Sequence, residues 1–256
     1  MYPCIGRGHG GRVIRASLLW SRTLADIGAM RIWRGRVESS EVKWSYDRSE
    51  LIADGIVHGI GLSAALVGVT ALIFYATVWS TSGQLAAASI YGAGLVLTLS
   101  VSFLYNLYPV CRTKWLLRRL DHSAIFVLIA ATYTPFLQRG WDDPFLFSML
   151  IGMWAVALLG IAIKCLLPGR FDRLAILLYL AMGWGGVLAA KSLFAALSAT
   201  TLVLVVVGGL IYSVGIIFHV WERLRFQNAI WHGFVVAGSA VHYSAVLSCI
   251  SGASAA

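Results

Sequence analysis

Seven stretches of mostly apolar residues, each long enough to cross a bilayer, follow one another between residues 54 and 250. A transmembrane α-helix needs about 20 such residues, because each residue advances the helix by 1.5 Å and the hydrocarbon core is about 30 Å thick. We expect helices at 54–78, 85–107, 121–138, 145–167, 174–190, 198–220 and 228–250. Short polar loops such as TSGQ at 81–84 separate them. The sequence therefore predicts an all-α membrane protein built as a seven-transmembrane helix bundle.

Composition and charge agree with this class and argue against a water-soluble domain. Hydrophobic residues make up 59% of the chain and charged residues 12%, whereas soluble domains carry roughly 25% charged residues. The net charge of +9 suits a nucleic-acid partner in principle. However, all Lys and Arg residues except Arg139 and Lys191 lie on the same side of the predicted spans as the N-terminus. The positive-inside rule then predicts a cytoplasmic N-terminus and a C-terminus outside.

The charge distribution and the apolar spans also indicate where the protein lies and what it contacts. We expect an integral, multi-pass membrane protein, with membrane lipids as partners and no nucleic acid. Residues 50–252 form the predicted transmembrane domain, and residues 1–49 form a basic N-terminal arm. The arm lacks a clean apolar stretch followed by a small-residue cleavage site, so we do not expect a secretory signal.

Three interpretations of the arm stay open. It is a disordered basic segment, or it contains an amphipathic surface helix near RVIRASLLWSRTL that anionic lipids attract. Alternatively, Met30 is the true start of the protein. The four cysteines form no CxxC pair, and we interpret Cys4, Cys111, Cys165 and Cys249 as free thiols.

Polar side chains recur four residues apart inside these apolar helices. Residues at i and i+4 share one helix face, and under the predicted topology each such pair lies near the cytoplasmic side. An acidic group inside a membrane costs about 2.5–3.5 kcal/mol and usually faces a cavity or a partner. We therefore predict a polar cavity near the inner leaflet. Its residues are Ser102, Asn106, Asp121, Asn228 and His232, with possible support from Glu50, Asp54, His58 and His122.

Simpler roles exist for individual members of this set. Asp54, Asp121 and Asn228 lie near helix starts, where they can act as N-caps or dipole partners. Ser102 and Asn106 can form interhelical hydrogen bonds. His242 follows His232 by ten residues, or about 15 Å along a helix, too far for a shared metal site. We interpret His242 as a buried hydrogen-bonding residue.

Several segments resemble the hemolysin III family, which groups with the progestin and adiponectin receptors and, more remotely, with alkaline ceramidases. The resemblance covers about residues 45–250 and is carried by ELIADGIVHGIG at 50–61, SFLYN at 102–106, LRRLDHSAIFVLIAATYTPF at 117–136, LYLAMGW at 178–184, GGLIYSVGIIF at 208–218 and NAIWHGFVVAGSAVHY at 228–243. It implies seven helices with a cytoplasmic N-terminus, and with it we expect the bacterial inner (plasma) membrane as the location.

The resemblance also implies a zinc site near the cytoplasmic face, from which this chain departs. In the family pattern, Ser102 matches a serine, Asp121 an aspartate and His232 a histidine. Asn106 and Asn228 stand where the pattern has its other two histidines. An asparagine amide is a weak ligand for zinc, which prefers His, Cys and carboxylate. We therefore expect no bound cofactor and a cavity joined by hydrogen bonds. Zinc stays possible through His232 and Asp121, with Asp54, Glu50, His58 or His122 entering the ligand set.

Three functions remain. The first is a non-enzymatic role in membrane or lipid homeostasis with a degenerate metal site, which the missing ligands favour. The second, implied by the amide-cleaving relatives, is a zinc-dependent hydrolase of ceramide-type lipids. The third, suggested by the family name, is a channel-forming cytolysin.

Overall fold

The computed structural model describes residues 46–167, 172–221 and 223–252, and every regular element in these ranges is helical. The predictions for the arm before residue 46, including the choice of start codon, lie outside them. The elements are α2 (Arg48–Trp79), α3 (Ser82–Leu107), α4 (Arg112–Gln138), α5 (Pro144–Leu166), α6 (Asp172–Gly183), the 3₁₀ helix η1 (Gly185–Ala189), α7 (Ala190–Ala196), α8 (Ala199–Val220) and α9 (Gln227–Ser251).

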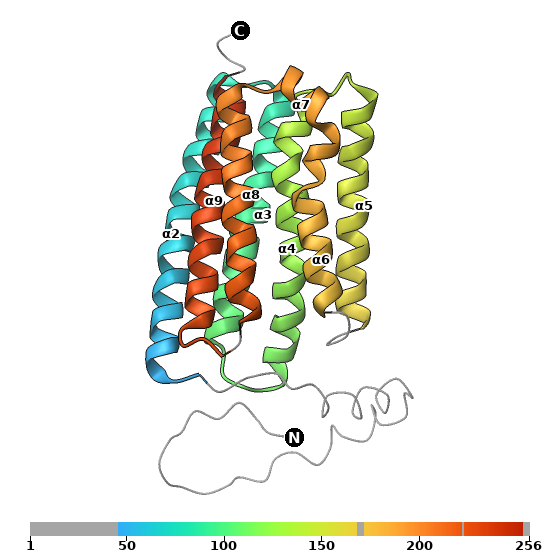
Figure 1. Cartoon of the computed structure of the whole chain (residues 1–256). Helices are drawn as coiled ribbons and strands as arrows, with labels where there is room; N and C mark the ends of the chain where they lie inside the picture. The colour runs from blue at the N-terminus through green and yellow to red at the C-terminus, as the bar shows by residue number, and fades with distance from the viewer. Residues whose placement is uncertain (1–45, 168–171, 222, 253–256) are drawn as a thin grey trace, which may run out of the picture.

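The helices run side by side as one bundle of seven membrane-length spans, as predicted (Figure 1). Helix α9 packs against α8 and α2, α3 lies between α2 and α4, and α5 packs on α4. Helices α2, α4, α6 and α9 begin at the lower end of Figure 1, where α3, α5 and α8 end. We call this lower end the polar end. That it faces the cytoplasm stays a sequence-based prediction.

Burial within α2 shows how the bundle separates core from lipid-facing surface. Leu72 is fully buried, whereas Val67, a little more than one turn earlier, is 72% exposed. In a bilayer such an exposed apolar face is solvated by lipid tails, so contact between helices depends on close packing of small residues. Gly160 of α5 shows this, because a Cβ atom there would lie 2.4 Å from the ring of Phe126 in α4.

Two spans begin earlier than predicted, for local reasons. Helix α2 begins at Arg48 because Asp47 caps it and Glu50 completes a capping box. Helix α4 begins at Arg112, nine residues before the predicted start at 121. Its first turns carry several basic residues, which a search for apolar stretches leaves out. The structure therefore extends α4 beyond the apolar segment at the polar end.

The fifth span, predicted as one helix at 174–190, is broken and longer, because it continues through η1 and α7 to Ala196. The break lies at Trp184. The hydroxyl of Tyr133 in α4 donates to the carbonyl of Gly183 at 2.8 Å and accepts from the backbone N–H of Gly186 at 2.8 Å. Non-helical backbone at membrane depth is tolerated where its polar groups find partners. Here Tyr133 is the partner of both the carbonyl group and the N–H group.

The prediction of free thiols is wrong for Cys111, which is disulfide-bonded. Cys165 and Cys249 are free.

Candidate functional site

A buried carboxylate, Asp54 of α2, joins the first and last spans at the polar end. Its Oδ1 atom lies 2.7 Å from Nδ1 of His232, and its Oδ2 atom accepts a hydrogen bond of 3.2 Å from the side-chain amide of Asn228. Both partners lie in the first two turns of α9. Because a carboxylate only accepts, Nδ1 of His232 carries the hydrogen.

His58 stands one turn after Asp54 and extends the network toward α3. Its Nδ1 atom lies 2.8 Å from the backbone carbonyl of Asp54, and its Nε2 atom lies 3.2 Å from the hydroxyl of Ser102. A carbonyl only accepts, so Nδ1 donates to it, and Nε2 of the neutral ring accepts from the serine. The ring meets that of His232 edge-on, with 4.2 Å between centroids. The α2 and α9 imidazoles thus lie in direct contact.

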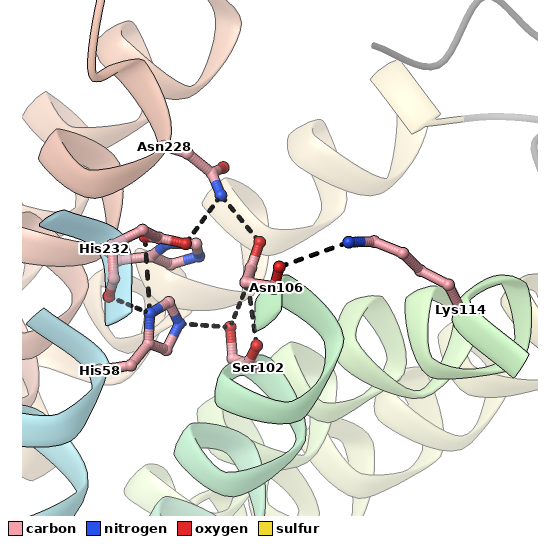
Figure 2. Close-up of polar contacts among 7 residues, drawn as sticks. His58, Ser102, Asn106, Lys114, Asn228 and His232 are labelled. Atoms are coloured by element: carbon pink, nitrogen blue, oxygen red, sulfur yellow. Dashed lines mark hydrogen bonds and ion pairs between the residues drawn. The ribbon is translucent and has the colours of Figure 1, made fainter. Parts of the chain in front are cut away.

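Asn228 and Asn106 connect α9 to α3 and complete the network. The amide group of Asn228 donates to Oδ1 of Asn106 at 2.7 Å, and Asn106 in turn donates to the backbone carbonyl of Ser102 at 2.9 Å. Lys114 of α4 donates to the carbonyls of Asn106 and Tyr108, which lie at the end of α3 and have no helical partner. Figure 2 shows these contacts except the one to Tyr108, and every side chain drawn there has a polar partner.

The remaining candidates occupy three different positions. Asp121 lines the same cavity as His58, Ser102 and His232, and its carboxyl group interacts with the Ser102 hydroxyl. Glu50 does not enter the cavity. Its side chain caps α2 and accepts from the backbone N–H of Phe226 at 3.1 Å, which fixes the turn before α9.

His122 belongs to a separate charged cluster that joins α4, α5 and α6. Its electrostatic neighbours include Arg118, Lys164 and Asp172. Asp172 pairs with Arg118 at 2.9 Å and with Lys164. Burial alone would raise the pKa of Asp172, but the hydrogen bond and charge of Lys164 and the charge of Arg118 lower it to about 2. This cluster holds the polar ends of three helices together, and none of its four side chains lines the cavity.

The cavity leads from the polar cluster into the middle of the bundle. Along α4 its lining runs from Asp121 to Phe136, which is about 22 Å at the helical rise of 1.5 Å per residue. Its volume of about 170 Å³ far exceeds the about 10–15 Å³ that one water needs. Most of its wall is apolar and comes from α4, α6, α8 and α9, for example Leu128, Ile129, Ile176, Leu180, Val205 and Val235.

The metal ligands implied by the resemblance can be compared with this geometry. Asn106 and Asn228 fit zinc poorly, because the amide of Asn228 directs its N–H groups at Asn106 and Asp54, and donors do not bind a cation. Asp54, His58 and His232 fit better. Their ligand atoms all lie within 4.8 Å of one another, and all three residues are buried. Two histidines and one carboxylate form a known type of zinc site with an open fourth position.

Sequence reasoning placed Asp54 and His58 in a supporting role and named His232 and Asp121 as the first ligands. In the structure Asp121 is not part of the three-residue group. The four-residue spacing of Asp54 and His58 was a usable signal, because it puts both on one face of α2. The sequence could not show that this face meets α9.

Seven spans around a buried polar cluster define the chain as a multi-pass integral membrane protein with a polar site inside its bundle. The family model for haemolysin-III related proteins matches residues 49–243. The chain therefore belongs to the haemolysin-III related family, which confirms the resemblance.

Similarity to curated proteins supports the same family. The chain is 39% identical to the "Hemolysin-3 homolog" of Bacillus subtilis (strain 168), over 77% of this chain and 93% of that protein. It is 38% identical to "Hemolysin-3" of Bacillus cereus, over 77% and 90%. It is 31% identical to the human "Monocyte to macrophage differentiation factor", over 62% and 68%.

Proposed function

We propose that the protein is a non-enzymatic lipid-binding protein of the bacterial plasma membrane and acts in lipid homeostasis. It binds one long-chain amphiphile inside the bundle. The head group lies against His58, Ser102, Asp121 and His232, and the hydrocarbon chain follows the apolar wall. The observation that carries this proposal is the single cavity that joins the buried polar cluster to an apolar passage about 22 Å long.

The dimensions and chemistry of the cavity suit such a ligand. Ligand sites are mostly apolar with a few convergent polar groups that fix orientation. A passage of about 22 Å exceeds half of the about 30 Å hydrocarbon core, so its length suits an extended acyl chain. Asp54, Asn106 and Asn228 are joined to one another and to Nδ1 of His232 by hydrogen bonds, which supports a function that needs no metal.

A second candidate, a metal-dependent lipid hydrolase, is favoured by one observation, the grouping of Asp54, His58 and His232. These three residues would hold zinc, which when bound polarises a carbonyl group and activates water. The Nδ1–H of His58 donates to a backbone carbonyl, which fixes the ring and leaves Nε2 as the ligand atom. Asp121 and Ser102 would orient a polar head group beside it. The described helices add no support for a channel-forming cytolysin.

Metal content of the detergent-purified protein separates the two candidates. The wild type is compared with an Asn106→His, Asn228→His double variant and with His58→Asn. We expect no stoichiometric zinc in the wild type and about one zinc per chain in the double variant, because the latter restores two imidazoles beside His232. About one zinc per chain in the wild type, lost in His58→Asn, would put the hydrolase first.

Lipid binding is tested directly by mass spectrometry of co-purified lipids and by titration with stearic acid. Gly209 lines the cavity, so Gly209→Phe should fill it and reduce bound lipid at least tenfold. Gly152→Phe is the matched control, because a Cβ atom there meets nothing within 4 Å on the exposed face of α5. Equal lipid binding by the two variants would contradict a ligand inside the bundle.

A further inference from the structure

A second polar group lies deep in the cavity, far from the cluster at the polar end. His242 of α9 lines the cavity together with His232. The two are ten residues apart on one helix, which is about 15 Å along its axis. The Nδ1 atom of His242 is buried and has no hydrogen-bond partner among the described residues. The expectation of a buried hydrogen bond within the protein is therefore wrong for this atom.

Two residues of α8 hold the His242 ring in place by packing against it. A Cβ atom at Gly208 of α8 would lie 2.7 Å from Cδ2 and Nε2 of the imidazole, so the missing side chain makes room for the ring. The ring of Tyr212 stacks on the imidazole, with 5.4 Å between centroids and 19° between planes. The Tyr212 hydroxyl is engaged with Ser239 at 2.8 Å. The imidazole is thus positioned by packing, while its Nδ1 atom has no hydrogen-bond partner among the described residues.

Such an arrangement is unfavourable without a further partner. A buried polar atom that makes no hydrogen bond costs free energy, and such atoms in proteins are nearly always paired with protein, water or ligand. Because His242 lines a cavity large enough for more than one water, its partner can come from outside the chain. A neutral imidazole carries one donor and one acceptor. A hydroxyl group has both functions, so it pairs with either nitrogen.

We propose that His242 is a second polar contact for the bound amphiphile, and that this ligand carries a hydroxyl group part-way along its hydrocarbon chain. A hydroxy fatty acyl chain has this chemistry. With its head group at His232, a hydroxyl on carbon 12 of an extended 18-carbon chain lies near the level of His242, about 15 Å along the helix axis. This inference rests on the proposed lipid binding and narrows it to a class of ligand.

The test uses the full-length protein in detergent and two probes, stearic acid and 12-hydroxystearic acid, titrated by calorimetry. We expect the wild type to bind the hydroxy acid roughly five- to tenfold more tightly, the ratio that one additional hydrogen bond gives. His242→Phe keeps an aromatic ring beside Tyr212 but has no hydrogen-bonding nitrogen, so it should bind both acids equally. His242→Gln keeps a donor and an acceptor and should retain part of the preference.

The possible results separate this inference from the proposed function. Equal affinities in the wild type would overturn the role of His242 while leaving lipid binding intact, and would mean that water satisfies the imidazole. A preference that persists in His242→Phe would overturn it as well. No binding of either acid by the folded wild type would overturn both proposals together.

Discussion

Replacement of Asp54 by asparagine tests whether the buried carboxylate holds the first and last spans together. The change keeps the size of the side chain but removes its charge. Asp54 accepts hydrogen bonds from His232 and Asn228. An asparagine has one acceptor oxygen, and its amide group would face one of these two donors. One hydrogen bond to a charged group is therefore lost, and one buried donor is left without an acceptor.

The size of the effect follows from these two losses. A hydrogen bond to a charged group contributes about 1.5–3 kcal/mol, and an unsatisfied buried donor costs about 1–3 kcal/mol. Interhelical hydrogen bonds in membranes are often weaker, about 0.6 kcal/mol on average, so we expect a total loss of about 2–4 kcal/mol. With about 2–4 °C for each kcal/mol, the midpoint of thermal unfolding should fall by roughly 5–15 °C.

The assay is thermal unfolding of detergent-purified protein in the presence of a chelator, so that no bound metal contributes. Asp142→Asn is the control, because Asp142 is exposed and the same chemical change there should leave the midpoint unaltered. An unchanged or higher midpoint for Asp54→Asn would refute the reasoning. It would mean that the cost of burying the carboxylate exceeds what its hydrogen bonds return.

A charge exchange between α2 and α9 sharpens this test. Asn228→Asp alone places a second carboxylate next to Asp54 and should destabilise the protein, because like charges at this distance repel. Combined with Asp54→Asn, it restores one carboxylate and one amide to the same pair of positions. The double variant should be more stable than the sum of the single effects by at least 1 kcal/mol, a coupling typical of residues in direct contact. Additive effects would show that the two side chains do not interact.

Three further predictions address packing, pH and topology. Gly160→Ala should lower the thermal midpoint, because its Cβ atom collides with Phe126 and overpacking costs about 1–3 kcal/mol, whereas Gly152→Ala on the open face of the same helix should not. Burial would raise the pKa of Asp172, but Lys164 helps to hold this pKa at about 2. Because the pKa is lower in the folded state than in the unfolded state, ionised Asp172 stabilises the fold above about pH 4, and this contribution is lost as the pH falls toward 2. The wild type should therefore lose more stability between pH 5 and pH 3 than Asp172→Asn, and equal losses would contradict this. Alkaline phosphatase fused to the C-terminus should be active and a fluorescent protein there dark, if the positive-inside assignment is correct; the reverse pattern would overturn it.

The sequence predicted the seven spans well, because a membrane-length apolar stretch is a local signal that needs no knowledge of neighbours. The polar pairs at four-residue spacing were equally visible, since each pair lies on one helix. The centre of the network was misjudged. Asp54 meets residues of α9 that lie more than 170 positions later in the chain, and no local pattern reports such a contact.

The break in the fifth span was missed for a different reason. Hydropathy measures whether a segment suits lipid and is insensitive to the path of its backbone. Gly183 and Gly185 lie inside the range predicted as one helix, whereas in the structure α6 ends at Gly183 and η1 begins at Gly185. The cavity was predicted only as a polar pocket at one end. Its apolar extension depends on how side chains from four helices meet.

The hydroxyl of Tyr133 forms hydrogen bonds with the backbone of both Gly183 and Gly186. Which substitutions position 133 tolerates therefore depends on the solvent around these backbone groups. In a soluble protein, backbone groups released by Tyr133→Phe could turn to bulk water at little cost. At membrane depth the lipid tails offer them no partner, and each unsatisfied group costs several kcal/mol. A substitution that removes a single oxygen atom is therefore mild in water and severe in a bilayer. The set of sequences that this fold accepts is thus restricted by the membrane as well as by the protein interior.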